Sequence, residues 1–181
     1  MTAVTIIGSG TMGRAIQAIA VAAGATVQSL SRADTGAITG EVVVLAVPYP
    51  SLDDVLARYG PQLAGKVVVD ITNPRDPSTG DWPLPADTSG AELLAARLPG
   101  SIVLKAFNTT PADRLAAVVA GVLPGTGLVA GDERHAKQRI MSLWEGGGVR
   151  VVDAGPLSRA RALERETLAE RTSEAAVDTS G

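Results

Sequence analysis

Ile6-Ile7-Gly8-Ser9-Gly10-Thr11-Met12-Gly13 is the stretch that decides the fold of this chain. An apolar run, residues 3–8, leads into the glycines, and apolar residues at helical spacing follow them over residues 11–23. Between a strand and a helix, a Gly-x-Gly-x-x-Gly pattern indicates a turn that binds a dinucleotide. The first glycine permits the tight turn, the second lets the backbone approach a pyrophosphate, and the third lets the helix pack closely on the strand. We therefore expect a phosphate site at the helix N-terminus rather than a glycine-rich turn without a ligand. The residues of this site are Gly8, Ser9, Gly10, Thr11, Met12 and Gly13.

The rest of the chain continues this alternation of strand and helix. Short Val- and Ile-rich runs recur between Ala- and Leu-rich stretches, which favours a mostly parallel sheet covered by helices. The sequence thus predicts an α/β fold, a compact Rossmann-type doubly wound sheet of about seven strands. Ser51 and Asp132 are expected as N-caps of two of the helices. The predicted strands are 3–8, 26–30, 41–48, 66–71, 102–107, 126–130 and 150–153, and the predicted helices are 11–23, 51–59, 89–98, 111–120 and 132–145.

The predicted sheet lacks one unit of the usual pattern. Residues 26–30 and 41–48 read as successive strands with only a short polar stretch between them. Parallel neighbours need a connection of about a dozen residues or more, and a helix plus a strand does not fit here. We therefore expect the crossover unit after the second strand to be missing, which would leave the adenine of a bound dinucleotide exposed.

Length and composition indicate one domain. With 181 residues, 45% of them hydrophobic, the chain can bury one substantial core. We expect a single dinucleotide-binding domain over residues 1–171 that ends in a short charged helix, and a disordered tail over residues 172–181. The net charge of -3 and a pI near 5.2 offer no basic surface for nucleic acid or an anionic membrane, so neither is expected as a partner.

Several classes of chemistry are excluded by residue type. The chain has no cysteine, which removes disulfides, thiol catalysis and thiolate metal sites, and its single histidine excludes an all-histidine metal site; no metal is expected. An apolar strand begins almost at Met1, without the features of a secretory signal. No apolar run approaches the roughly 20 residues of a membrane-spanning helix. A soluble, cytoplasmic protein is the expectation.

The choice of cofactor is read at the end of the second predicted strand, where NAD-binding proteins use an acidic residue on the ribose. Ser31 and Arg32 stand at this position. A hydroxyl beside a guanidinium suits the 2′-phosphate of NADP, because arginine offers phosphate a fixed fork of charged donors. The alternative makes Asp34 the ribose acid and Arg32 a solvated surface charge. NADP(H) is the expected cofactor.

The sequence offers few groups for acid or base catalysis. His135 lies in a charged first turn and is expected to be solvated, and Lys105 is expected to lie along its strand with its ammonium at the rim. We therefore expect no catalytic residue, which suits hydride transfer between two stacked rings. The long polar loop 72–89, which holds Trp82, is a candidate lid.

Several stretches together resemble one family. They are residues 6–13, the pair Ser31-Arg32, and residues 43–48, 103–109, 136–141 and 153–157. With these, the chain resembles the NADPH:coenzyme F420 oxidoreductases and also the cytosolic oxidoreductase domain of the six-transmembrane epithelial-antigen metalloreductases, which passes hydride from NADPH to a flavin. The Lys-Ala-Phe-Asn-Thr stretch, residues 105–109, and the Asp-Ala-Gly-Pro-Leu stretch, residues 153–157, are specific to this group.

The resemblance implies roles for residues outside the glycine motif. Ala46, Val47 and Pro48, with the turn of Asn73 and Pro74, would frame the nicotinamide at the carboxyl ends of the strands. The pocket of the ring that exchanges hydride would be lined by Asn108, Thr109, Gly155, Pro156 and Leu157. Without the resemblance, Asn73 and Asn108 read equally well as turn residues at strand ends, and Pro48 and Pro156 as simple breakers.

Three functions compete on these grounds. The first is an NADPH-dependent oxidoreductase that exchanges hydride with coenzyme F420 or a flavin, and the resemblance implies a homodimer. The second is an NADPH-dependent reductase of a small imine or carbonyl metabolite, and the third is a non-catalytic NADP(H) sensor or partner subunit. One departure bears on the acceptor: residues 159–174 are strongly charged, where the family commonly has an apolar C-terminal helix.

Overall fold

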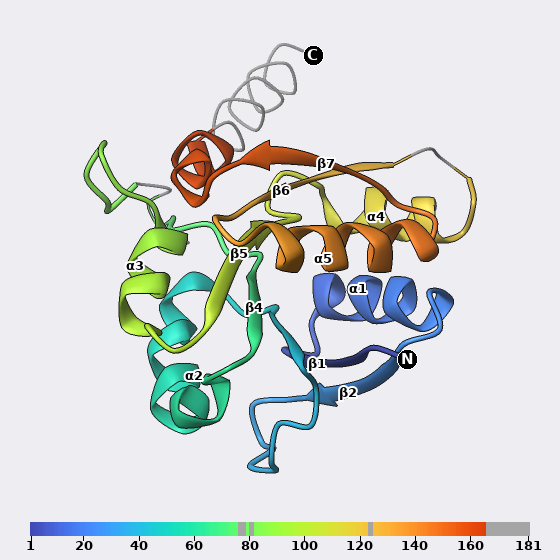
Figure 1. Cartoon of the computed structure of the whole chain (residues 1–181), viewed down its shortest axis with the longest axis horizontal. Helices are drawn as coiled ribbons and strands as arrows, with labels where there is room; N and C mark the ends of the chain where they lie inside the picture. Colours follow the sequence, from blue (N-terminus) through green and yellow to red (C-terminus); the bar gives the residue numbers. More distant parts are fainter. Residues whose placement is uncertain (76–78, 80–81, 123–124, 166–181) are drawn as a thin grey trace.

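The computed structural model describes residues 1–75, 79, 82–122 and 125–165 (Figure 1). Every predicted strand and helix is present within a few residues of its predicted bounds, and the expected tail, 172–181, lies outside the described residues. Three short 3₁₀ turns, η1 (Tyr49–Ser51), η2 (Gly60–Leu63) and η3 (Leu157–Arg159), join them. The elements are β1 (Ala3–Ile7), α1 (Thr11–Ala22), β2 (Thr26–Leu30), β3 (Val42–Leu45), α2 (Leu52–Tyr59), β4 (Val67–Asp70), α3 (Gly90–Arg97), β5 (Ile102–Ala106), α4 (Ala112–Val119), β6 (Thr126–Ala130), α5 (Arg134–Gly146) and β7 (Arg150–Gly155).

The described strands form one seven-stranded sheet in the order β2-β1-β3-β4-β5-β6-β7. Strands β1 to β5 are parallel, and β6 and β7 run the opposite way, because β6 pairs antiparallel with β5. β3 pairs directly with β1, so the missing crossover unit after β2 is confirmed. The Gln28 side chain secures the short connection that replaces it, since it bonds the carbonyl of Ala37 and the backbone N–H of Thr39.

Helices cover both faces of the sheet. Figure 1 shows α1, α4 and α5 on one face and α2 and α3 on the other. The first face buries Ile16 and Ile19 of α1 completely, and Trp144 of α5 meets Phe107 edge-on at 5.1 Å between ring centroids. Full burial of an aliphatic side chain of this size stabilises the fold by about 1.5–3 kcal/mol. This double-sided core explains the continuous valine runs of β3 and β4, whose residues are all buried.

The two predicted helix caps have different outcomes. Ser51 stands at the N-cap position of α2 as predicted, but its side chain makes no capping bond, because residues 49–51 form the turn η1 and the chain enters α2 already helical. The helix predicted from 132 begins at Arg134, and its cap is Glu133, which accepts from the N–H groups of His135 and Ala136. Asp132 instead accepts from the N–H of Leu157 and holds the turn after β7.

The chain after β7 folds back over α3. Residues 160–165 are helical, with Leu163 buried, and η3 buries Leu157 against Ala91 of α3. Arg161 forms a two-pronged ion pair with Glu92 of α3, with N–O distances of 2.8 and 2.6 Å. Arg165 lies over the ring of Trp82, 5.9 Å from its centroid, so the described end of the 72–89 loop packs against this segment.

The ion pair between Glu92 and Arg161 predicts a pH dependence of stability. Hydrogen bonds from Arg161 hold the pKa of Glu92 below its ordinary value of 4.5. A carboxylate with a lowered pKa in the folded state stabilises the fold fully above its unfolded pKa and loses this contribution as the pH falls through the folded value. The melting temperature of Glu92→Gln should therefore lie below that of the unaltered protein at pH 7, and the gap should close near pH 3. A gap that stays constant over this range would contradict the assignment.

Within the described residues, no helix combines the length and the apolar character needed to cross a membrane.

Candidate functional site

The glycine turn lies between the carboxyl ends of β1, β2 and β3. The N–H of Gly8 donates to the carbonyl of Leu30, and the N–H of Ala46 donates to the carbonyl of Ile7. Gly8 has φ +122°, and a side chain there would run into the carbonyl of Ala46, while a side chain at Gly13 would run into the carbonyl of Gly8. These two glycines let strand, turn and helix pack together. A side chain at Gly10 would meet nothing within 4 Å, so open space lies in front of the helix start.

A first hollow of about 300 Å³ opens on the β2 side of the glycine turn. Apolar atoms of Val47 and Val55 contribute to its wall, and polar groups enter from the end of β2 and from α2. The predicted cofactor residues Gly8, Ser9, Gly10, Ser31, Arg32, Ala46, Val47 and Pro48 all line it, together with Ile7, Ser51, Asp54, Val55, Arg58 and Tyr59.

Charged groups at the rim of the first hollow pair with one another and with nearby backbone groups. Arg32 pairs with Asp54 at 3.4 Å, and both side chains are largely exposed, at 86% and 72%. The hydroxyl and N–H of Ser31 donate to Asp34 at 2.6 and 2.7 Å, and they hold the pKa of Asp34 below its ordinary value. Arg58 donates to the carbonyls of Arg32 and Asp34 and adds a second guanidinium. The first hollow thus has two guanidinium groups, those of Arg32 and Arg58, and one carboxylate, that of Asp54, in its lining.

Removal of the Asp54 carboxylate is expected to favour a phosphate in the first hollow. Asp54→Asn leaves Arg32 without its carboxylate partner, and NADPH should bind about two- to fivefold tighter at low salt, since an exposed pair is worth up to about 1 kcal/mol. Asp53→Asn is the matched control, because Asp53 is the preceding residue of α2 but pairs with Arg97, outside this hollow. Calorimetric titration measures both. Equal effects of the two variants would argue against a phosphate beside Arg32.

A second hollow of about 350 Å³ lies across the glycine turn, between η1 and the turn after β4. It shares Gly10, Ala46, Val47 and Pro48 with the first, and is completed by Thr11, Met12, Tyr49, Pro50, Ile71, Thr72, Asn73 and Arg75. Burial, with Glu164 and Asp70 nearby, raises the pKa of Tyr49, so its phenol is neutral at ordinary pH. The hydroxyl oxygen of Thr72 is buried without a hydrogen-bond partner in the described part of the chain.

The floor beside the second hollow is built on paired asparagines. The Asn73 amide donates to the carbonyl of Asn108, and the Asn108 amide donates to the Asn73 side chain, both at 3.1 Å, and to the carbonyl of Leu163 at 2.8 Å. Phe107, which precedes Asn108, has φ +56°, a left-handed conformation that is costly for a residue other than glycine. Its ring packs edge-on against Trp144, and the side chain of Asn108, the next residue, points toward Asn73.

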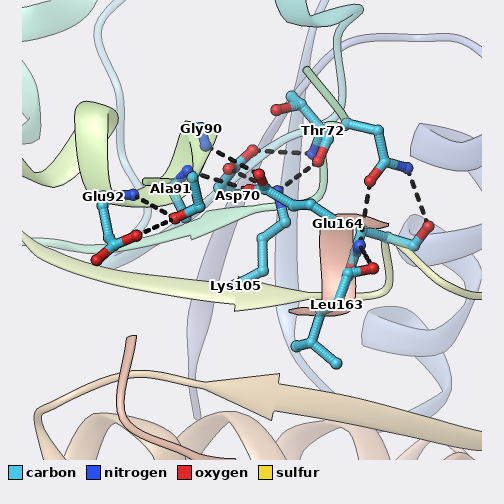
Figure 2. Close-up of polar contacts among 11 residues, drawn as sticks. Asp70, Thr72, Gly90, Ala91, Glu92, Lys105, Leu163 and Glu164 are labelled. Atoms are coloured by element: carbon cyan, nitrogen blue, oxygen red, sulfur yellow. Dashed lines mark hydrogen bonds and ion pairs between the residues drawn. The ribbon is translucent and has the colours of Figure 1, made fainter. Parts of the chain in front are cut away.

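A buried ion cluster lies behind the same turn (Figure 2). Lys105 of β5, Asp70 of β4 and Glu164 of the C-terminal segment have side chains that are 0% exposed. The Lys105 ammonium is 3.0 Å from Asp70 and 2.7 Å from Glu164, and it also donates to the carbonyl of Thr72. The expectation of a Lys105 ammonium at the rim is therefore wrong, because two carboxylates replace the water that it would otherwise need.

The remaining predicted site residues lie apart from the two hollows. Pro74 is buried near Gly90, and Thr109 is partly buried. Gly155 and Pro156 form a turn that Lys137 holds through Asp153 and the Gly155 carbonyl, and the Leu157 side chain is buried. Within the described residues, neither hollow is lined by Gly13, Pro74, Thr109 or the 155–157 turn. Their ligand roles stay predictions.

Several known proteins are similar to this chain. Residues 27–74 match a family described as NADP oxidoreductase, coenzyme F420-dependent. The F420-dependent NADP reductase of Methanocaldococcus jannaschii is 31% identical over 133 residues, which make up 71% of this chain and 59% of that protein. The chain is a relative of the F420-dependent NADP oxidoreductases. It spans somewhat more than half of the length of this curated member.

Two further proteins extend the comparison. Metalloreductase STEAP3 of Rattus norvegicus is 32% identical over 130 residues, which are 71% of this chain and 25% of that protein. The crystal structure of a putative F420-dependent NADP reductase from Arthrobacter sp. FB24 superposes with a TM-score of 0.78 at 25% identity and covers 91% of this chain and 90% of that one. The resemblance inferred from the sequence motifs is thereby confirmed.

Three residues in or behind the two hollows of this chain were not predicted from the sequence. Arg58 and Tyr49 line the hollows, and Glu164 completes the buried cluster. Arg58 follows Asp54 by one helical turn, so the face of α2 that carries Asp54 could have revealed it. Glu164 carries no local signal, because it stands in a run of charged residues typical of a solvated helix.

Proposed function

We propose that this chain is an NADP-dependent oxidoreductase that transfers hydride between NADP(H) and a deazaflavin or flavin ring such as coenzyme F420. One observation carries the proposal: two hollows lie on either side of the glycine turn and share Gly10 and residues 46–48. A single dinucleotide would therefore extend from one to the other, with its pyrophosphate at the start of α1. The names of the relatives agree with this reading.

The residues present fit such a cofactor. Gly8 and Gly13 shape the turn, Gly10 leaves room for a pyrophosphate, and Arg32 with Arg58 would hold the 2′-phosphate in the first hollow. Ala46, Val47, Pro48 and Asn73 would frame the nicotinamide in the second hollow. When bound, NADPH supplies the hydride, and the chain binds the ring, orients it and keeps water from one face.

Stacking of two rings needs no protein acid, because a ring that accepts hydride takes up the charge itself and positioning supplies most of the catalysis. We propose Asn108 as a residue that acts through Asn73, given their paired amides. Thr109, Gly155, Pro156 and Leu157 remain candidates for the acceptor side.

The decisive experiment is an anaerobic acceptor screen. NADPH and protein are mixed in stopped flow with coenzyme F420, FMN or FAD, and the absorbance of each acceptor is followed. We expect bleaching of F420 or a flavin under single-turnover conditions. Binding of NADPH without a spectral change in any acceptor would remove the proposed reaction, and turnover of an imine or carbonyl compound in its place would establish the second candidate. A stable partner that co-purifies without turnover would favour a sensor.

Assembly and location are further predictions. A homodimer is tested by light scattering of the purified protein, and a cytoplasmic location by fractionation of the source cells. A monomer over the full concentration range would contradict the first.

A further inference from the structure

We propose that Lys105 is a positioning residue for the second hollow, where it sets the turn of Thr72 and Asn73, and that Glu164 of the C-terminal segment holds it there. The proposal rests on the proposed function, because the second hollow is taken to receive the nicotinamide. It assigns a role to a buried lysine and to a carboxylate 59 residues further along the chain.

Thr72 is held through both of its backbone polar groups. Its carbonyl accepts from Lys105, and its N–H donates to Asp70 Oδ1 at 2.8 Å. The other oxygen of Asp70 pairs with Lys105, so lysine, carboxylate and turn backbone form a closed ring of contacts. Thr72 and Asn73 both line the second hollow. A change at Lys105 would therefore move the wall of the hollow without removing any residue that lines it.

The C-terminal segment completes this set of contacts. An ammonium has three donors, and here they meet Asp70, Thr72 and Glu164 (Figure 2). Glu164 also accepts from the N–H groups of Gly90 at 2.9 Å and Ala91 at 3.1 Å, at the start of α3. These N–H groups offset the second negative charge of the cluster. Glu164 thus fixes the third donor of Lys105, and the other two meet Asp70 at the end of β4 and the Thr72 carbonyl in the turn.

Stability alone is a weak reason for such a cluster. Removal of charges from water costs several kcal/mol per ion, and well-packed apolar residues are often equally stabilising. The chain nevertheless places three fully buried charges from three separate elements behind one turn. A geometric role for the turn accounts for their position, whereas a stabilising role would suit any place in the core.

Two ligands separate positioning from general damage. NADPH would occupy both hollows, whereas 2′,5′-ADP carries only the adenosine half and its 2′-phosphate and would occupy the first alone. Calorimetry measures Kd for both ligands with the unaltered protein, Lys105→Met, Glu164→Gln and Arg161→Gln. Arg161 is the matched control, because it ties the same C-terminal segment to the same helix through Glu92 and stays outside the cluster.

We expect Lys105→Met to weaken NADPH binding about tenfold and to leave 2′,5′-ADP binding within about twofold, because the turn of Thr72 and Asn73 lines the second hollow and not the first. Glu164→Gln keeps an oxygen for Gly90 and should show the same pattern at about threefold. Arg161→Gln should change neither ligand. Glu164→Gln decides the matter if Lys105→Met fails to fold by circular dichroism.

Other outcomes overturn the proposal. Equal losses for the two ligands, or unchanged NADPH binding in folded variants, would show that the cluster is only structural, and so would a failure of both variants to fold. In these cases the unaltered protein still binds NADPH and the proposed function stands. If the unaltered protein binds no NADPH, the proposed function fails and this inference fails with it.

Discussion

Arg32→Ala is expected to weaken NADPH binding roughly 30- to 100-fold and to leave NADH binding within about twofold, since charge-assisted bonds to phosphate are worth about 1.5–3 kcal/mol. NADPH and NADH differ only in the 2′-phosphate, so the ratio of their dissociation constants isolates this contact. The Arg32 side chain reaches the first hollow with 86% of its surface exposed, and among the described residues its ion-pair partner is Asp54, at 3.4 Å. A phosphate could displace this weak pairing at little cost.

Arg97→Ala is the control for Arg32→Ala. Arg97 is also an exposed arginine paired with an acidic residue of α2, but it lies outside both hollows. Arg97→Ala should leave the dissociation constants of NADPH and NADH unchanged in a fluorescence titration. If Arg32→Ala weakens both ligands equally, and Asp34→Asn weakens NADH, then Asp34 is the ribose acid and NAD becomes the cofactor.

Gly8→Ala is expected to lower the stability of the fold, whereas Gly10→Ala is expected to weaken cofactor binding without a loss of stability. A methyl group on Gly8 would overlap the carbonyl of Ala46 and require φ +122°, so the melting temperature should fall by about 10 °C for a cost of roughly 3 kcal/mol or more. Gly10 has φ -69° and open space where its methyl would stand, so Gly10→Ala should melt normally. The same methyl would occupy the path of a pyrophosphate.

Gly10→Ala should therefore lose about a hundredfold in NADPH affinity, or some 2.7 kcal/mol, with its stability intact. Differential scanning fluorimetry and calorimetry on the two variants give the comparison. The Gly8 variant acts as a control for the Gly10 variant, since both change the same loop. Undiminished NADPH binding by Gly10→Ala would place the pyrophosphate elsewhere.

Local patterns made the fold predictable. The strand, glycine turn and helix at residues 3–23 are encoded within one continuous stretch, and every contact that decides them is close in sequence. The missing crossover could be inferred by counting, because residues 31–40 leave no room for it. The capping bonds could not be predicted in the same way. The Ser51 side chain makes none, although it stands at the N-cap position of α2. Asp132 and Glu133 are neighbours of the same chemistry, and Glu133 caps α5 because Asp132 binds the later turn at Leu157.

The candidate site was only partly readable. Glycines and turn residues can be recognised in the sequence by residue type, whereas the burial of Lys105 depends on partners 35 and 59 residues away. A lone lysine in a strand and a glutamate in a charged run each read as solvated, and only their meeting in three dimensions makes an ion cluster. The charged residues after 159 depart from the apolar C-terminal helix that the family commonly has, and Glu164 and Arg161 use their charges to dock the segment on α3.

β2 ends the sheet, and among the described residues no further strand pairs with its outer edge. A purine that lay over this edge would gain little from apolar contact, so the hold on a dinucleotide would depend mainly on arginines and backbone N–H groups that face its phosphates. Attraction of this kind fades as the Debye length shrinks from about 10 Å at 0.1 M salt to about 3 Å at 1 M. The ionic strength of its surroundings would then decide how much of this protein carries its nucleotide.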